Sequence, residues 1–508
     1  MAALRLSPRH SPFMQLNRHV ITICLIGTVI FACPIAAQQT ELTDGKITDA
    51  IHQELFIDDA VSSHLIDIGV EKGIATLTGT VDNILAEERA VKLAQSVKGV
   101  RSVIDRLLVK PVARSDNEIR RDVITALAVD PVTESYEVRV NVDDGVATLT
   151  GEVQSWDEKK LCKTVTKSVK GVRKIVNNIS INFTVERSDN EIKNEIEKKL
   201  KLDPYVSGYL ITVEVANGNV VLDGTVGSAI EKNYAYSNCL VNGVNRVDDS
   251  GLAVNAELED TMQKQLKFKL KSDDAIKRAL KSALTWNIRT REFDIEVEVQ
   301  NMIVTLDGLV DNLAAKQAAG KTARNTSGVI SVNNMITVTP AALSDEEIAR
   351  NVKNALIWDP ILERHEITPQ VRNRKVYLYG AVDNIFEKQR AAIIASNITG
   401  VADVSNEVSY AKQQRQARDE QIKSAIKDQL YWNWYTEAND VTIRVEDGIA
   451  HIGGKVDNHF ERNAIVREAF DGGAHIVESK IQVSGYPREF GFRAYYNDDN
   501  ELIKDYHL

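Results

Sequence analysis

The sequence contains very little cysteine. Four of its 508 residues are cysteines, and two of these, Cys24 and Cys33, lie in an apolar stretch near the N-terminus. A fold built on a disulfide framework is therefore excluded, because such folds concentrate several cysteines in a short chain. For the remaining two, Cys162 and Cys239, two interpretations stay open: separate buried thiols at small-residue packing positions, or a bridge between neighbouring units.

Long apolar runs are also scarce. The longest, Val20–Cys33, follows three arginines and precedes Pro34-Ile-Ala-Ala37, a layout typical of a secretory signal occupying residues 1–37. We expect cleavage after Ala37 and a periplasmic protein. A retained inner-membrane anchor and a lipoprotein site at Ile30–Cys33 remain as alternatives, although the run is shorter than the ~20 residues of a spanning helix.

Basic residues are fewer than acidic ones. Without the three arginines of residues 1–37, the chain has 59 basic and 72 acidic side chains, a formal charge of −13. A field of this sign repels nucleic acid, so no nucleic-acid partner is expected. Hydrophobic residues at 43% and charged residues at 26% are ordinary for a folded protein.

What the sequence does contain is repetition. The phrase Gly145-Val-Ala-Thr-Leu-Thr-Gly151 occurs in six variants along the chain, and its second glycine returns at intervals of 72, 73, 84, 72 and 74 residues. A helix-start signal precedes each phrase, in its full capping-box form at Ser115–Glu118, Ser188–Glu191 and Ser344–Glu347. A fixed period of this kind indicates tandem domains.

The second unit shows the order of elements. Ile119, Val123, Ile124 and Leu127 form an apolar stripe on a first helix that ends at Asp130-Pro131. Residues 137–142 and 146–150 alternate as a hairpin, a second helix begins at Ser155, and residues 173–181 form a third strand. The predicted fold class is α/β of the α+β type: tandem α-β-β-α-β domains, each a three-stranded mixed sheet with two helices on one face.

The unit resembles the BON domain, in its glycine-flanked hairpin phrase and in its Gly-Val turn, as at Gly171-Val172. The family takes its name from bacterial osmotically inducible and nodulation proteins. The resemblance implies a periplasmic location, phospholipid-membrane binding and protection against envelope or osmotic stress, and it transfers no catalytic residue. The predicted domains are the signal at 1–37, BON-like units at 41–111, 112–184, 185–255, 272–340, 341–412 and 413–485, a basic insertion at 256–271 that separates two trios, and an aromatic tail at 486–508.

The glycine pair raises the question of a phosphate loop. Met302 and Arg374 replace the first glycine in two copies, and no Gly-Lys-Ser/Thr ending follows, so a hairpin turn is favoured over a nucleotide site. Trp286, Trp358 and Trp432 recur at the end of the first helix and are predicted to lie in the core. His451, His459 and His475 have no accompanying ligand set, so neither a metal nor another cofactor is expected.

Two features are candidates for membrane contact. Trp156 begins a second helix, the element through which the resemblance implies lipid contact; ordinary packing is the alternative. The basic residues of the insertion and the helix after it could hold anionic headgroups, or merely protect a sheet edge. They are Lys264, Lys267, Lys269, Lys271, Lys277, Arg278 and Lys281.

The sequence thus predicts a non-enzymatic periplasmic protein whose partners are an anionic phospholipid surface or envelope proteins. Several weak sites on one chain would add up to avidity. The competing hypothesis is a protein–protein scaffold without lipid binding. For the tail, an extra hairpin on the sixth unit and a docking peptide are both open.

Overall fold

The fold is that of a computed structural model, which describes residues 42–58, 60–183, 185–256, 271–340, 342–410, 419–436, 441–483, 492–496 and 502–505, the last two as backbone. The chain divides between Glu41 and Leu42, and every described element belongs to the part from Leu42 onward. The predicted signal therefore lies outside the described residues. None of the described helices has both the length and the apolar character needed to cross a bilayer.

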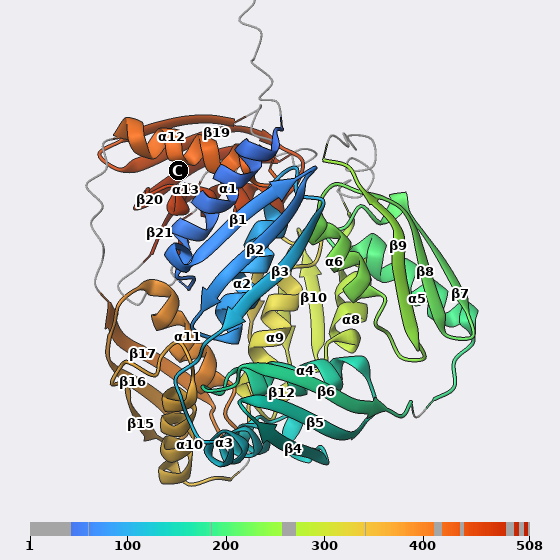
Figure 1. Ribbon diagram of the computed structural model, residues 1–508, viewed down its shortest axis with the longest axis vertical. Helices are drawn as coiled ribbons and strands as arrows, with labels where there is room; N and C mark the ends of the chain where they lie inside the picture. Colours follow the sequence, from blue (N-terminus) through green and yellow to red (C-terminus); the bar gives the residue numbers. More distant parts are fainter. Residues whose placement is uncertain are drawn as a thin grey trace, which may run out of the picture. The chain divides into compact units, whose positions relative to one another are not determined.

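The first three repeats follow the predicted order, with a short 3-10 turn added before the hairpin (Figure 1). Repeat 1 contains α1 (Asp44–Ile57), η1 (Ser63–Leu65), β1 (Ile66–Glu71), β2 (Ile74–Val81), α2 (Ile84–Ser96) and β3 (Ser102–Val109). Repeat 2 contains α3 (Asp116–Val129), η2 (Thr133–Ser135), β4 (Val138–Asp143), β5 (Val146–Val153), α4 (Trp156–Lys167) and β6 (Lys174–Ile181). Repeat 3 contains α5 (Asp189–Leu202), η3 (Gly208–Leu210), β7 (Ile211–Ala216), β8 (Asn219–Val226), α6 (Ala229–Asn238) and β9 (Arg246–Val254).

The last three repeats keep this plan with local changes. Repeat 4 contains α8 (Asp273–Trp286), β10 (Glu296–Gln300), β11 (Ile303–Asp307), β12 (Leu309–Val310), α9 (Leu313–Arg324), β13 (Ser331–Asn334) and β14 (Thr337–Val338). Repeat 5 contains α10 (Asp345–Trp358), β15 (Thr368–Arg372), β16 (Lys375–Val382), α11 (Ile385–Ser396) and β17 (Asp403–Tyr410). Repeat 6 contains α12 (Asp419–Trp432), β18 (Val441–Glu446), β19 (Ile449–Val456), α13 (His459–Asp471), β20 (Ile476–Val483), β21 (Phe492–Tyr496) and β22 (Leu502–Asp505).

The main sheet of each repeat is mixed, as predicted; repeat 4 has in addition a two-stranded parallel sheet, β12–β14. In repeat 2, β5 is central: it pairs antiparallel with β4, Val140 opposite Leu149, and parallel with β6, Ala147 opposite Ile175. A hairpin supplies the antiparallel pair, and the helix α4 provides the crossover that a parallel pair requires. In repeat 6 the sheet grows to five strands, because β21 pairs antiparallel with β20 and β22 with β21. For the tail, the structure shows the extra hairpin.

Each repeat has its own small core between the helices and one face of the sheet. In repeat 2 it includes Ile119, Val123 and Leu149, all nearly inaccessible to solvent. The prediction for Ile124 was wrong, since this side chain is 44% exposed. The buried face of α3 instead carries Asp122, whose carboxylate is neutralised by Arg114 at 2.6 Å.

Candidate functional site: the surfaces between the repeats

The turn of each hairpin forms a small anion-binding concavity, and the protein fills it internally. Asp144 and Gly145 both have positive φ, and their backbone N–H groups donate to the two carboxylate oxygens of Asp116 at 3.0 and 2.9 Å. Successive N–H groups in this conformation make a nest for an anion, and the first helical residue of the same repeat supplies it. The same arrangement recurs in every repeat, through Asp44, Asp116, Asp189, Asp273, Asp345 and Asp419.

The phosphate-loop hypothesis is thereby excluded on physical grounds, since the donors that a phosphate would need are already used. Met302 and Arg374 adopt φ of 65° each in place of the turn glycine, and the carboxylate contact persists there at 2.8 and 2.9 Å. The turn is thus the marker of a repeated structural module.

Trp156 lies at the contact between repeats 2 and 3. Its indole nitrogen donates to the backbone oxygen of Val244 at 2.8 Å, and the ring is partly buried, with the Lys159 ammonium 5.6 Å from its centre. Its polar atom is therefore engaged inside the protein, although part of the ring remains accessible. Lipid contact through Trp156 stays a prediction.

The basic insertion is only partly within the described residues. Lys264, Lys267 and Lys269 lie outside them. Lys271 is partly buried, and burial lowers the pKa of its ammonium group. On α8, Arg278 and Lys281 are exposed and Lys277 is partly exposed, so this helix keeps a cationic surface.

Second helices connect the first three repeats in a closed cycle. Lys167 of α4 pairs with Glu88 of α2 at 2.6 Å, and Asn233 of α6 donates to Gln95 of α2 at 2.7 Å. The Trp156 contact with Val244 closes the cycle between repeats 2 and 3. Each repeat thus contacts both others, in a head-to-tail arrangement.

Further contacts cross from this trio to the second one. The Lys170 amide of repeat 2 donates to the Trp358 oxygen of repeat 5 at 2.6 Å, and the Thr399 amide donates back to the Val129 oxygen at 2.9 Å. Lys170 and Thr399 both precede the Gly-Val turn glycine, and Val129 and Trp358 both end a first helix. The contact is therefore reciprocal, as in a two-fold symmetric interface.

The tryptophan column lies at contacts of this kind and not in the cores of its own repeats, so that prediction was wrong. Trp432 packs against the core of repeat 1, and its backbone oxygen accepts from Lys98 at 2.9 Å. Trp286 lies beneath the ammonium groups of Lys198 and Lys199 of repeat 3, at 5.3 and 5.8 Å. A column of aromatic residues in a repeat marks an interface here.

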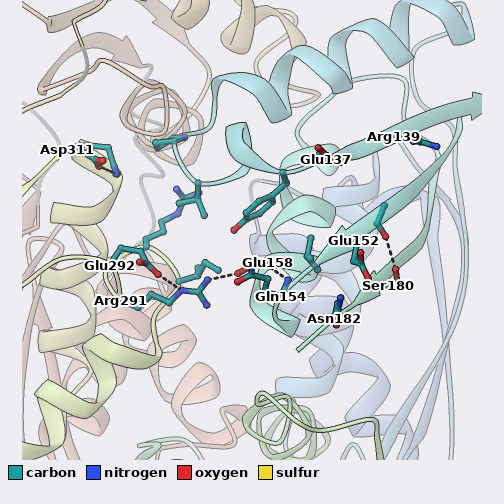
Figure 2. Close-up of a pocket in the computed structure, with 18 of the residues that line it drawn as sticks. Glu137, Arg139, Glu152, Gln154, Glu158, Ser180, Asn182, Arg291, Glu292 and Asp311 are labelled. Atoms are coloured by element: carbon teal, nitrogen blue, oxygen red, sulfur yellow. Dashed lines mark hydrogen bonds and ion pairs between the residues drawn. The ribbon is translucent and has the colours of Figure 1, made fainter. Parts of the chain in front are cut away.

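A cleft of about 1110 Å³ lies between repeats 2 and 4. Figure 2 shows Arg291 pointing across to Glu158, with Arg139, Glu152 and Ser180 on the opposite wall. Glu158 is almost fully buried, at 3% exposure. Deeper in, Arg289 pairs with the buried carboxylate of Asp130 at 2.7 Å.

The two arginines of repeat 4 therefore neutralise two buried acids of repeat 2. A buried carboxylate needs such a partner, because desolvation penalises its charge. With both guanidinium groups paired and carboxylates abundant on the walls, the cleft has the chemistry of an interface more than that of a phosphate site.

Aromatic side chains form the contact between repeats 3 and 6. The ring of Tyr205 lies 5.2 Å from that of Tyr435 and 6.1 Å from that of Phe460, measured between centroids. The Tyr435 hydroxyl donates to the Pro204 oxygen at 3.3 Å, and burial raises the pKa of its phenol well above the ordinary value. The cluster was not predicted from the sequence, although an aromatic run was visible there, with Trp432, Trp434 and Tyr435 within four residues.

Among the described residues, His365, Asp383 and Glu387 have potential metal-ligand atoms within 4.8 Å of one another. The His365 Nε2 lies 2.9 Å from Glu387, and the guanidinium of Arg364 lies 2.9 Å from Asp383. The guanidinium group of Arg364 already supplies a positive charge beside these carboxylates, so the group is best described as an ion-pair network. The histidines singled out from the sequence are not part of it.

The two cysteines are separate free thiols, and both are buried in the cores of their own repeats. Burial raises the pKa of each thiol to about 12. The interpretation as buried structural thiols is confirmed for the described structure, and neither has the thiolate character of a reactive cysteine.

The fold and its contacts define a class: a tandem array of small α-β-β-α-β domains that pack on one another through shared surfaces. The BON domain family matches six segments of the chain, residues 43–111, 115–182, 188–256, 272–340, 344–412 and 418–485. The chain belongs to the BON domain family, with six copies.

Two relatives share part of the sequence. Osmotically-inducible protein Y of Escherichia coli (strain K12) is 29% identical over 145 residues, which cover 27% of this chain and 72% of that protein. The uncharacterized protein in the gshII 5'region of Anaplasma centrale is 28% identical over 147 residues, 28% of this chain and 95% of that protein. A solved structure of CdsD, a structural protein of the Type III secretion system of Chlamydia trachomatis, is 15% identical and covers 44% of this chain and 100% of its own, with a TM-score of 0.12.

Proposed function

We propose that this chain is an exported, non-enzymatic periplasmic protein that associates with the cell envelope by multivalent binding to anionic phospholipid, in protection against osmotic or envelope stress. Membership of the BON family and similarity to an osmotically inducible protein support the stress-related role and the envelope location. The observation that carries the lipid part is the charge of α8, where Lys277, Arg278 and Lys281 outnumber Asp273 and Asp274, with Arg278 and Lys281 exposed. In the matching helix α10 the acids outnumber the bases, because Asp345, Glu346 and Glu347 accompany Arg350 and Lys353. Basic residues near an anionic membrane contribute about 1 kcal/mol each.

Flotation with liposomes of phosphatidylglycerol tests this. The variant Arg278→Glu with Lys281→Glu should lose most of the binding of the mature chain. Its matched control is Arg350→Glu with Lys353→Glu, since these residues occupy the same two positions of α10 and are equally exposed. Equal binding by both variants would remove α8 as the lipid surface.

A second function, a protein–protein scaffold, is favoured by a different observation. The second helices, which the family resemblance links to lipid, are engaged between repeats through Lys167, Asn233 and Trp156. Surfaces used within the chain are less available to a membrane. A scaffold would stay at the bottom of the flotation gradient at every lipid composition, and envelope proteins would be its partners.

A further inference from the structure

The first and the last repeat of the chain are joined by backbone hydrogen bonds. The Lys98 amide donates to the Trp432 oxygen at 2.9 Å, and the Trp434 amide donates to the Ser96 oxygen at 3.3 Å. An isolated antiparallel bridge between Val97 and Asn433 lies between them. This contact uses the same two elements as the contact between repeats 2 and 5, namely the end of a first helix and the residues before the turn glycine.

The side chains at the two contacts differ in kind. The eleventh residue of the first helix is Glu54 in α1 and Gln429 in α12, whereas it is Ala126 in α3 and Ala355 in α10. The tenth residue of the second helix is Glu468 in α13, at 6% exposure. The residues at that position in repeats 2 and 5 are apolar, Val165 and Ile394.

The polar residues of the first-to-sixth contact are hydrogen-bonded to one another. With its nitrogen toward the carboxyl groups, the Gln429 amide donates to Glu54 Oε1 at 2.9 Å and to Glu468 Oε2 at 3.2 Å. The Asn433 amide donates to the other Glu468 oxygen at 2.7 Å. One amide therefore joins two carboxyl groups, one from each end of the repeat array.

Positive charge around this pair is weak. Arg89 is half-exposed and already bound to Asp58 at 2.7 Å, and Arg467 is exposed, 3.9 Å from Glu468. Asp471 of the sixth repeat adds a further negative charge. Two carboxylates that share a desolvated site without a strong cation cannot both ionise cheaply, so a proton is the natural counter-charge.

We propose that Glu54 and Glu468 form a proton-dependent clasp that holds the first and sixth repeats together when the carboxyl pair is protonated and releases them when both groups ionise. Opening would expose Trp432 and the edge of the repeat 1 core against which it packs. The first and last repeats would then present surfaces that the closed form covers.

The direction of the pH dependence follows from the two acids. Burial, followed by the Asp471 charge, raises the pKa of Glu54 to about 7 and that of Glu468 to about 8. Both pKa values lie above the ordinary 4.5. Between pH 4.5 and about 8 the closed form therefore binds more protons than the open form. The contribution of the two protons to the clasp is full below pH 4.5, falls as the pH rises from 4.5 through 7, and is lost above about 8.

Amide hydrogen exchange on the full mature chain between about pH 5 and pH 9 tests the clasp, with rates corrected for intrinsic exchange; the change should occur below about pH 8 and level off above it. Protection at Lys98 and Trp434 should fall with rising pH, by up to about tenfold per pH unit for each proton released. The Lys170 and Thr399 amides report the contact between repeats 2 and 5 in the same sample. Its cross-repeat carboxylates, Glu363 and Glu134, are each bound to a partner of the other repeat, so these amides should keep their protection. Parallel changes at both contacts would overturn the proposal.

The variant Glu54→Gln with Glu468→Gln removes both ionisations and keeps the size of the side chains. It should give protection at Lys98 and Trp434 that no longer depends on pH. A pH slope equal to that of the wild-type chain would overturn the clasp. Should the variant fail to fold, the comparison of the two contacts within the wild-type chain remains decisive.

Discussion

The contact between repeats 2 and 5 and the contact between repeats 1 and 6 use the same kinds of element but differ in geometry and chemistry. The first is reciprocal, whereas both backbone hydrogen bonds of the second join the end of α12 to the residues before the turn glycine of repeat 1. The first places Ala126 and Ala355 where the second places Glu54 and Gln429. In the first contact each cross-repeat carboxylate has its own partner, Glu363 the ammonium of Lys170 at 3.5 Å and Glu134 the hydroxyl of Thr399 at 3.2 Å. In the second, two carboxyl groups share one amide, which makes its strength depend on protons. The repeats therefore share a scaffold, and their individuality lies at the surfaces where they meet.

The largest effect should come from placing a carboxyl group in repeat 5 at the helix position that Glu468 occupies in repeat 6. Ile394→Glu introduces an acid at a partly buried position of repeat 5. We expect the free energy of unfolding to fall by about 3 kcal/mol at pH 8, because the charge loses hydration and has no partner. Urea denaturation at pH 6 and pH 8 measures this, and the loss should be smaller at pH 6.

Ile394→Gln is the control for that variant, since it also loses apolar packing but carries no charge. It should cost the same at both pH values. An equal pH dependence in the Gln variant would show that the loss of packing, and not ionisation, governs the contact.

The next effect concerns a buried carboxylate that is neutralised by a guanidinium group instead of a proton. Arg291→Ala leaves Glu158 buried without its cross-repeat partner, and we expect a loss of about 2–3 kcal/mol at pH 7. Denaturation followed by far-UV circular dichroism gives the value. Arg139→Ala, at an exposed residue of the same cleft, should change stability by less than about 0.5 kcal/mol.

A smaller effect is expected from the aspartate that binds the hairpin turn, a feature common to all six repeats. Asp345→Ala removes the carboxylate that accepts from the Asn373 and Arg374 amides, at a cost of about 1–2 kcal/mol. Since repeat 5 is affected and repeat 1 is not, amide exchange should rise at Lys170 before it rises at Lys98. Glu346→Ala, an exposed acidic neighbour, should leave both amides unchanged.

The smallest effect is a gain. Arg374 has φ of 65°, a conformation that glycine adopts without strain, so Arg374→Gly should stabilise repeat 5 by about 0.5–1 kcal/mol despite the loss of a hydrogen bond to Pro340. Thermal denaturation detects a change of this size. Arg374→Ala keeps the Cβ atom and should show no gain; a gain in this variant would point to the lost guanidinium instead of the backbone.

The repeated module could be predicted from the sequence because its signals are local. Capping boxes at Ser115, Ser188 and Ser344 form as predicted, with the Ser side chain and the third helical residue bonded reciprocally. Hydrogen bonding to the serine lowers the pKa of Glu118, Glu191 and Glu347. Alternation and turn residues likewise predicted the mixed sheets.

The surfaces between repeats were less predictable, because they depend on which residues of distant repeats meet. Trp358 has the pattern of a core residue, and only the partner Lys170 shows that it lies at a contact. Two signals were available. Glu468 places a carboxyl group at a position that is apolar in repeats 2 and 5. Arg289 and Arg291 follow Asn287, an uncharged residue at the position where repeats 2 and 5 have Asp130 and Asp359. A departure from the consensus of a repeat points to an interface.

The head-to-tail cycle of the second helices has a consequence for concentration. Three separate subunits joined by contacts as small as those of Lys167 with Glu88 and Asn233 with Gln95 would fall apart on dilution. Placed on one chain, the same domains stay at an effective concentration of the order of millimolar, set by the linkers. Each contact can then be weak, and each copy is free to diverge without loss of the assembly.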